Sequence, residues 1–495
     1  MVLADLRDLP HHHRCAAVDE RGVRGGVRGP GLDRRPHLRR PHHAGDLDPG
    51  AVVTTVADRI DIRAAALDEY TVDETGRSGQ RPRGIVRAAD LEDVLGTVEW
   101  ARHTGTPIIC RGAGTSLEGH LLARGDEVVL DLSALDAIRD ISPTDFTATV
   151  LPGVTRTRLN AAAAAYGLQF TVDPGADASL GGMAATNASG TTTVRYGGMH
   201  ANTLAMQAVF ADGTVARLGR AVRKSSSGYD LKDLLIGSAG TLGIITELTV
   251  RLHPIPEWQR SLRVSFRTVR DAVAAAVDML GRALPVSRAE LVDAVSMAAI
   301  NAYRGTRHPV APALFLDVTA TSEAAAELDE AEIRDLCVGH QALEIVAAQT
   351  HTAQHRLWED RHNLFFALKA RHPGHRFLVT DTAVPYSRIA DAVATAERLG
   401  ELLDLDISVA GHIGDGNVHV VVPYTTQSAE RAREFSDQVV RHALSVGGTA
   451  SGEHGIGLAK KQYLRAEHGA AVELMTAVKR ALDPLGLLNP GKILD

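Results

Sequence analysis

The sequence predicts a multidomain protein of the α/β or α+β class, and three observations support this. The chain has 495 residues, more than one hydrophobic core usually organises, so we expect two or three domains. Short apolar runs typical of strands alternate with longer runs of helical periodicity. Glycine is dense over residues 173–243, after which a regular strand–helix rhythm follows.

Composition narrows the functional class. Hydrophobic residues make up 44% and charged residues 23%, as in ordinary globular proteins. The net charge of −7 gives no reason to propose a nucleic-acid partner. Cys15, Cys110 and Cys337 lie far apart without a C-x-x-C pair, which excludes a cysteine-ligated iron–sulfur cluster and suits a reducing compartment. No apolar run is long enough to span a bilayer, so we expect a cytoplasmic protein, or one peripheral to a membrane.

Residues 1–45 differ from the rest because Arg, Gly, Pro and His replace any apolar periodicity. We expect a disordered extension there, or a start that the mature protein lacks. The remaining boundaries follow from a linker-like stretch at 252–256 and a helical tail. They predict one domain over 46–254, a second over 255–445 and a C-terminal segment over 446–495.

Individual elements follow from local signals. Asp90 is a typical N-cap for a helix that ends near His103. Beyond residue 256 the pattern predicts an antiparallel sheet with helices on one face. Strands are expected at residues 84–87, 107–110, 128–132, 148–151, 208–210, 244–246 and 314–318. Further helices are expected at residues 156–166, 269–280 and 323–336.

Three glycine-rich segments predict a holder for a dinucleotide. The first, Arg111–Gly119, leaves a strand directly, and its glycines would let backbone N–H groups approach a pyrophosphate. The spacing is not G-x-G-x-x-G, which disfavours NAD on a Rossmann unit. The second segment (173–190) is rich in small and hydroxyl residues, and the third (237–246) has a similar composition. Such backbone can lie against a large flat ligand.

Two motifs near the end of the chain predict a metal site. His412 and His419 lie seven positions apart, and Glu453 follows with His454 beside it. Glycines flank both motifs and allow close approach to a ligand. Two imidazoles and one carboxylate leave coordination positions open for a substrate, and they do not discriminate between Zn²⁺ and Mn²⁺.

The glycine-rich run resembles the FAD-binding domain of the vanillyl-alcohol oxidase (PCMH) type. Within that type, the chain resembles the cytochrome-linked D-lactate dehydrogenases, which are relatives of glycolate oxidase and D-2-hydroxyglutarate dehydrogenase. The resemblance covers about residue 50 to the end. It is carried by both histidine motifs and by residues 172–180, 188–191, 194–197, 226–229, 357–363, 380–385 and 489–492.

The resemblance implies an α+β fold: a two-subdomain FAD-binding domain, an α+β cap domain with an antiparallel sheet, and a C-terminal helical segment that completes the active site. It implies non-covalent FAD, because Ser116 and Leu117 stand where covalent relatives place a histidine. The FAD-binding positions would be Arg111, Gly112, Ala113, Gly114, Thr115, Ser116, Gly119, Pro174, Gly175, Ala176, Ser179, Gly182, Asn187, Ser189, Gly190, Gly243 and Ile244.

The resemblance also implies the chemistry. A divalent metal on His412, His419 and Glu453 would grip a D-2-hydroxy acid, His454 would take the hydroxyl proton, and a hydride would pass to flavin N5. Arg361 would bind the substrate carboxylate, and Asn417 would line the same pocket. Dicarboxylate-specific relatives carry a lysine where this chain has Val379, which favours a monocarboxylate such as D-lactate.

Alternatives stay open. A glycolate oxidase flavoprotein subunit and a D-2-hydroxyglutarate dehydrogenase use similar residues. A metal-dependent hydrolase would leave the glycine-rich half unexplained, and a non-catalytic nucleotide-binding module would leave Glu453 and His454 unexplained. The electron acceptor would be a cytochrome, a quinone or an electron-transfer flavoprotein. The oligomeric state is undetermined, with a homodimer as one alternative.

Overall fold

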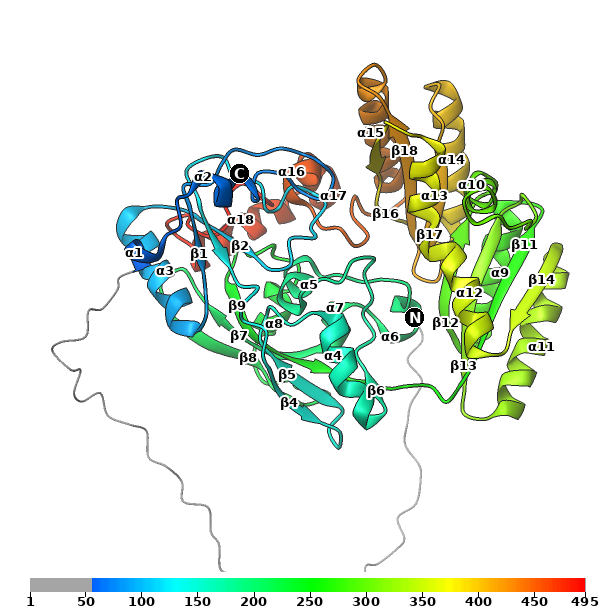
Figure 1. Ribbon diagram of the computed structural model, residues 1–495, viewed down its shortest axis with the longest axis horizontal. Helices are drawn as coiled ribbons and strands as arrows, with labels where there is room; N and C mark the ends of the chain where they lie inside the picture. The colour runs from blue at the N-terminus through cyan, green and yellow to red at the C-terminus, as the bar shows by residue number, and fades with distance from the viewer. Residues whose placement is uncertain (1–55, 495) are drawn as a thin grey trace, which may run out of the picture. The chain divides into compact units, whose positions relative to one another are not determined.

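A computed structural model describes residues 56–494 (Figure 1). The predicted extension over residues 1–45 and Cys15 lie outside the described residues. The described part contains sheets of three, five, eight and two strands together with helices. None of its helices is both long enough and apolar enough to cross a bilayer.

A small parallel sheet opens the described chain. Its strand order is β1 (Gly84–Arg87), β3 (Val128–Asp131), β2 (Ile108–Arg111). Helix α3 (Leu91–Thr104) covers it and begins as predicted, because the Asp90 carboxylate accepts the Asp93 N–H at 3.0 Å. Two short helices precede the sheet, α1 (Val56–Arg59) and α2 (Ala64–Asp68).

A second, antiparallel sheet follows the first. Its order is β4 (Ile138–Ser142), β5 (Thr147–Val150), β9 (Ile244–Arg251), β7 (Thr203–Val209), β8 (Val215–Gly219). The associated helices are α4 (Arg156–Ala163), η1 (Ala164–Tyr166), α5 (Leu180–Thr186), α6 (Thr193–Tyr196), α7 (Met199–Asn202) and α8 (Leu231–Leu235). The stretch predicted as a plain linker contains β10 (His253–Pro254), which pairs with β6 (Leu168–Gln169).

The later half of the chain builds an eight-stranded antiparallel sheet, as predicted. The path is β14 (Ala342–Ala348), β11 (Trp258–Phe266), β13 (Ala313–Ala320), β12 (Val286–Val292), β17 (Ser408–His412), β18 (Asn417–Tyr424), β15 (Arg376–Val379), and β16 (Thr382–Ala383) also pairs with β18. The helices of this half are α9 (Val269–Gly281), α10 (Ala294–Arg304), α11 (Glu323–Gly339), α12 (His351–His362), α13 (Leu364–Arg371), η2 (Tyr386–Arg388), α14 (Ile389–Leu402) and α15 (Ala429–Ser445).

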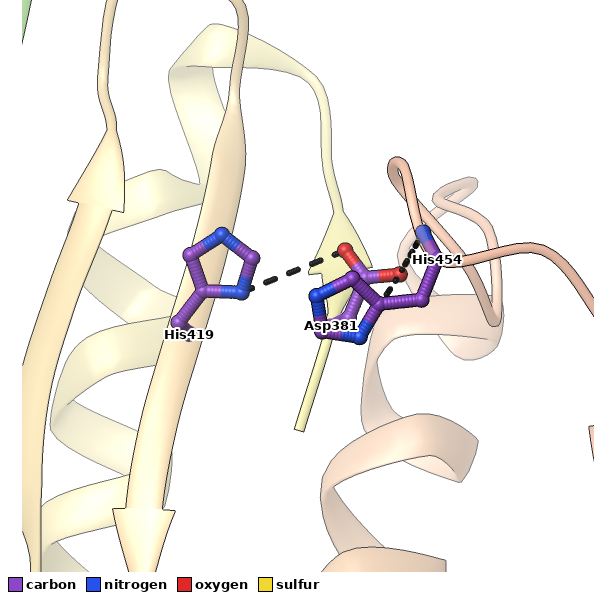
Figure 2. A group of neighbouring side chains, drawn as sticks. All are labelled: Asp381, His419 and His454. Atoms are coloured by element: carbon purple, nitrogen blue, oxygen red, sulfur yellow. Dashed lines mark hydrogen bonds and ion pairs between the residues drawn. The ribbon is translucent and has the colours of Figure 1, made fainter. Parts of the chain in front are cut away.

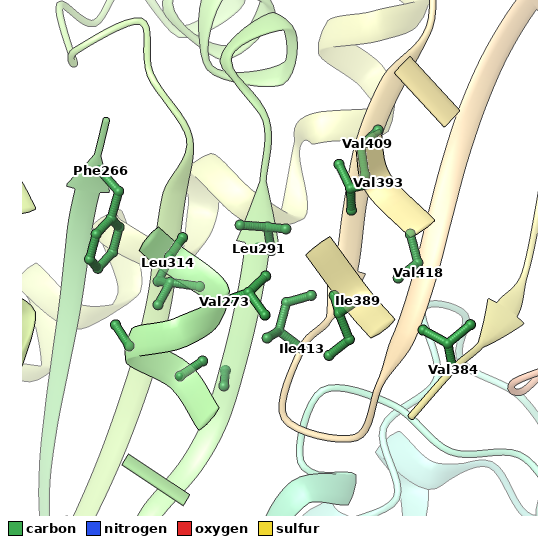
Figure 3. Packing of buried hydrophobic residues seen from close by; sticks show 14 of the residues in the cluster. Phe266, Val273, Leu291, Leu314, Val384, Ile389, Val393, Val409, Ile413 and Val418 are labelled. Atoms are coloured by element: carbon green, nitrogen blue, oxygen red, sulfur yellow. The ribbon is translucent and has the colours of Figure 1, made fainter. Parts of the chain in front are cut away.

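Helices cover both faces of this sheet, so the prediction of one covered face is wrong. On β13, Leu314 and Leu316 join the core beneath α9, α11, α14 and α15. Figure 3 shows Leu314 in this core with Val273 of α9 and Ile389 of α14. Their neighbour Phe315 points the other way and joins the core beneath α10, α12 and α13. The period-2 alternation of a strand therefore separates two apolar layers. The sequence pattern hid this because a strand buried on both faces reads as one continuous apolar run.

The C-terminal segment returns to the first sheet, where the red helices in Figure 1 lie beside the blue strands. Ile108 on the edge strand β2 donates its N–H to the Leu487 carbonyl at 2.7 Å, and Asn489 donates to the Ala239 carbonyl at 2.8 Å. The chain thereby satisfies an edge that would otherwise be unpaired. The segment contains α16 (Gly457–Lys460), η3 (Lys461–Tyr463), α17 (Leu464–His468) and α18 (Ala471–Leu482).

A buried carboxylate ties the large sheet to its helices. Asp317 on β13 accepts the Trp358 indole N–H at 2.7 Å, and Arg288 lies 3.3 Å from it. Arg288 also reaches Asp173 of the second glycine-rich segment at 3.4 Å. Burial raises the pKa of Asp317, and the Arg288 charge opposes that rise. The ionised form of Asp317 is therefore stabilised by the hydrogen bond from Trp358 and by the charge of Arg288.

Replacing Trp358→Phe should lower the free energy of unfolding by about 1–3 kcal/mol, because the buried Asp317 carboxylate loses a donor. Urea denaturation followed by far-UV circular dichroism measures this. Trp258→Phe is the control, since the Trp258 indole has no hydrogen-bond partner among the described residues. Equal losses in both variants would contradict the role of the Asp317 bond.

Candidate active site

The hairpin of β17 and β18 brings His412 and His419 together. His412 ends β17, and Ala410 pairs with His419 across the ladder. The hairpin is tight: Gly416 has φ +86°, and a Cβ at Gly411 would come within 2.4 Å of the Asn417 carbonyl oxygen. The two imidazole centroids lie 5.2 Å apart. Both positions therefore require glycine if the two histidines are to lie close together.

Glu453 reaches this pair from the loop before α16. Its Oε1 lies 3.5 Å from His412 Nε2 and 3.3 Å from His419 Nε2. All three ligand atoms fall within 4.8 Å of one another. The structure therefore brings the three predicted metal ligands to one place.

The hydrogen bonds of the two histidines fit a cation. His412 Nδ1 lies 2.6 Å from Glu290 Oε1, and His419 Nδ1 lies 3.2 Å from the Thr380 carbonyl oxygen. A carbonyl or an ionised carboxylate can only accept, so each Nδ1 carries a hydrogen, and each Nε2 faces Glu453 and is free to bind a metal once it is deprotonated. Metal-binding histidines are usually oriented in this way.

Charge supports the same assignment. Burial opposes ionisation at Glu290 and Glu453, but neighbouring histidines, joined at Glu290 by Arg361, outweigh it and lower the pKa of both carboxylates. His412 lies between these two acids, and its pKa rises well above the ordinary value despite burial. The position therefore favours positive charge.

A second group, Asp381 with His419 and His454, also has ligand-like spacing (Figure 2). Asp381 is already occupied, because it accepts from Lys460 Nζ at 3.1 Å and from the His454 N–H at 2.9 Å. It also accepts from Ser451 Oγ at 2.8 Å. These bonds hold the loop that carries Glu453, so we assign Asp381 an organising role.

His454 stacks on His419, with ring centroids 5.5 Å apart and planes inclined by 17°. Its Nδ1 lies 3.3 Å from Glu118 Oε1, and its Nε2 lies 3.8 Å from Glu453 Oε1. Burial lowers the pKa of His454, yet Asp381 and Glu118 outweigh burial and raise it overall. The ring therefore holds a proton readily and lies next to the predicted ligands.

Arg361 and Asn417 lie at the same site. Arg361 Nη2 donates to Glu290 Oε2 at 2.8 Å, while its buried Nε has no partner. The Asn417 amide packs against Gly452, where a Cβ would lie 2.6 Å away, and its buried Oδ1 is unpartnered. Unsatisfied buried polar atoms are costly, which is consistent with a ligand that completes them.

The glycine-rich segments pack closely enough to form a cradle. A Cβ on Gly112 would lie 2.1 Å from Ser179 Oγ, which accepts the Ala113 N–H at 3.2 Å. A Cβ on Gly190 would lie 2.3 Å from the Asp173 carbonyl oxygen. The first two predicted FAD segments therefore lie side by side, as a shared flavin site requires.

The second glycine-rich segment also touches the histidine site. Ser189 Oγ donates to Glu453 Oε2 at 3.3 Å. The Ile244 side chain, in contrast, is buried in the core around β1–β3. Only the backbone of Ile244 is left for a cofactor contact.

Sequence reasoning gave no role to Glu290, Glu118 or Lys460. Lys460 lies 3.3 Å from Glu118, and Glu118 links the first glycine-rich loop to His454. The usable signal was an acidic residue between apolar neighbours: Glu290 lies between Ala289 and Leu291 on β12 and is itself fully buried. Its partner His412 is 122 positions away, which the sequence alone does not show.

Comparisons with known proteins agree with these observations. The FAD binding domain family matches residues 82–219, and the family of C-terminal domains of FAD linked oxidases matches residues 255–493. A probable mitochondrial D-lactate dehydrogenase of Danio rerio is 38% identical, covering 88% of this chain and 89% of the relative. A mitochondrial cytochrome D-lactate dehydrogenase of Arabidopsis thaliana is 36% identical, covering 83% and 73%.

Other matches are more distant. The glycolate oxidase subunit GlcD of Escherichia coli is 31% identical, covering 86% of both chains. Among solved structures, p-cresol methylhydroxylase matches with a TM-score of 0.69 and 18% identity, covering 89% of this chain and 94% of the other. That likeness, together with the antiparallel sheets, confirms the predicted α+β fold of the PCMH type.

These matches cover both halves of the described chain, and the FAD cofactor follows from the domains they share. The chain belongs to the FAD-linked oxidases, in the group that includes the cytochrome-linked D-lactate dehydrogenases.

Proposed function

We propose that this enzyme oxidises a D-2-hydroxy acid, with D-lactate to pyruvate as the first candidate. It would use non-covalent FAD and a divalent cation on His412, His419 and Glu453. The observation that carries the proposal is the pair of histidine Nε2 atoms that face Glu453 Oε1, beside a glycine-rich segment that Ser189 joins to Glu453. Several relatives at 32–38% identity are D-lactate dehydrogenases by name.

His454 is the proposed general base, and its Nε2 would receive the substrate hydroxyl proton. Glu118 at Nδ1 fixes the ring, and Asp381 holds the backbone N–H of the same residue. When bound, the cation would lower the pKa of that hydroxyl and FAD would accept the hydride. The chain itself supplies orientation and a place for the proton.

Arg361 is the proposed partner of the substrate carboxylate. Glu290 occupies one edge of its guanidinium, and the unpartnered Nε remains. Asn417 would line the same pocket through its free Oδ1. Val379, on β15, offers no charge to a second carboxylate, which supports a monocarboxylate substrate.

Further assignments are proposals of the same kind. We propose that Arg111–Gly119, Pro174–Gly190 and the backbone near Gly243 hold FAD. A cytochrome is the proposed electron acceptor, because relatives carry that word in their names. The choice between zinc and manganese, a cytoplasmic location, a homodimer and the domain boundaries stay predictions; several relatives are mitochondrial by name.

The rival functions predict different substrates and a different response of the flavin. Glycolate oxidation draws support from the similarity to GlcD. A metal-dependent hydrolase would use the histidine site alone and gives no reason for two FAD-linked domains. Substrate selectivity therefore decides between hydroxy acids, and flavin reduction decides against hydrolysis.

An anaerobic visible spectrum of the FAD-loaded protein tests the proposal. D-lactate should bleach the flavin band, whereas L-lactate should leave it unchanged. Bleaching by glycolate or D-2-hydroxyglutarate but not by D-lactate would replace the proposed substrate. Protein that binds no FAD would contradict the assignment as a whole.

Glu290→Gln should weaken binding of the divalent cation by about 10- to 100-fold, because the residue that orients a metal-binding histidine loses its charge. Competition with a chromogenic chelator measures the affinity. Glu344→Gln is the control, since Glu344 lies on β14 and, within residues 56–494, pairs only with Arg263. Unchanged cation affinity in Glu290→Gln would contradict this role.

His454→Ala should slow flavin reduction by D-lactate about 100- to 10,000-fold while FAD stays bound. Stopped-flow absorbance gives the rate, and the yellow colour of the purified variant reports the cofactor. His468→Ala, at an exposed position on α17, should reduce its flavin normally. A normal rate in the His454 variant would rule out its role as the base.

A further inference from the structure

A cavity of about 440 Å³ lies where the second sheet meets the large sheet. From the second sheet's side, α6 contributes Arg195 and Tyr196, and the end of β9 contributes Arg251. From the large sheet's side, the loop after α9 contributes Leu284 and the start of β12 contributes Val286. The volume lies within the usual range for small-molecule sites.

The polar lining of this cavity is cationic. Arg195 and Arg251 line it, and no acidic residue does. None of the described residues forms an ion pair with either arginine. The Arg251 Nε is buried and has no hydrogen-bond partner. Burial and the nearby Arg223 charge both lower the pKa of Arg251, so its positive charge is poorly compensated.

The imidazole of His253, which also lines the cavity, does not supply the missing negative charge. His253 Nε2 lies 2.8 Å from Asn202 Oδ1, and the ring packs edge-on against Tyr196. Burial, followed by Arg251 and Arg223, lowers the pKa of His253 to about 4. The histidine is therefore neutral at pH 7, and the two arginines are the charged groups that line the cavity.

The opposite wall is apolar. Leu280, Leu284 and Val286 line it, and Val194 adds a branched side chain from α6. A guanidinium matches a carboxylate in a planar, bidentate geometry. An anion with a short apolar chain would use both walls, whereas a small inorganic anion would use only the arginines.

We propose that this cavity binds a small carboxylate with a short apolar chain, at a site separate from the proposed active site. Val194 lies between them, since a Cβ at Gly414 in the His412–His419 hairpin would come within 2.6 Å of Val194. The occupant would touch both the FAD-binding part and the large sheet. Because Val194 lines the cavity and packs against Gly414, the occupant would contact the support of the His412–His419 hairpin. It would not contact the proposed metal ligands themselves.

Isothermal titration calorimetry of the full FAD-loaded chain with hexanoate tests this. The Arg361→Ala background removes the proposed carboxylate partner from the active site, so that hexanoate binding reports the cavity. Arg251→Gln in that background should weaken hexanoate binding at least tenfold. Leu284→Asn should weaken hexanoate but leave acetate binding unchanged. Arg217→Gln, at an exposed arginine on β8 that pairs with Glu247, should bind as the parent does.

Four outcomes would overturn the proposal. The parent could bind no hexanoate, or Arg251→Gln could bind it as tightly as the parent. Inorganic phosphate could bind as tightly as hexanoate, which would reject an apolar carboxylate as the ligand. Loss of FAD from Arg251→Gln would assign the cavity to the flavin. None of these readouts requires turnover, so failure here is distinguishable from failure of the proposed D-lactate oxidation.

Discussion

Burial of charge is the constraint on which the centre of this protein depends. Four carboxylates, Glu118, Glu290, Asp381 and Glu453, lie mostly or fully out of solvent, and each has a cationic or imidazole partner. Removing one partner from a buried pair typically costs about 3–5 kcal/mol. The elements that carry these side chains therefore cannot shift independently. The glycine turns, the β17–β18 hairpin and the loop before α16 together hold the four carboxylates beside their partners.

Strand register transmits this constraint. Glu290 on β12 pairs directly with His412 on β17. A slip of β17 by one residue would turn His412 to the other face of the sheet, away from Glu290. Helices cover both faces and fix the register of each strand through two apolar layers. The same cores that stabilise the sheet thus set the distance between Glu290 and His412.

Local sequence signals predicted much of this arrangement. Asp90 marked the start of α3, and the glycines around His412 and Glu453 marked the tight backbone packing that brings these side chains together. The two-sided covering of β13 was missed, because Leu314 and Phe315 are equally apolar whichever layer they join. Glu290, Glu118 and Lys460 were missed because their meaning depends on partners brought near by strand pairing and loop packing. The cavity at Arg251 is likewise visible only once two distant segments meet.

The bond between His454 and Glu118 spans 336 positions of sequence. At a synthesis rate of about 5–20 residues per second, the first glycine-rich loop would leave the ribosome roughly 20–70 s before its partner. During that interval the buried Glu118 carboxylate would lack His454 and Lys460. Co-translational folding therefore cannot complete the first glycine-rich loop, because its partners His454 and Lys460 are made last.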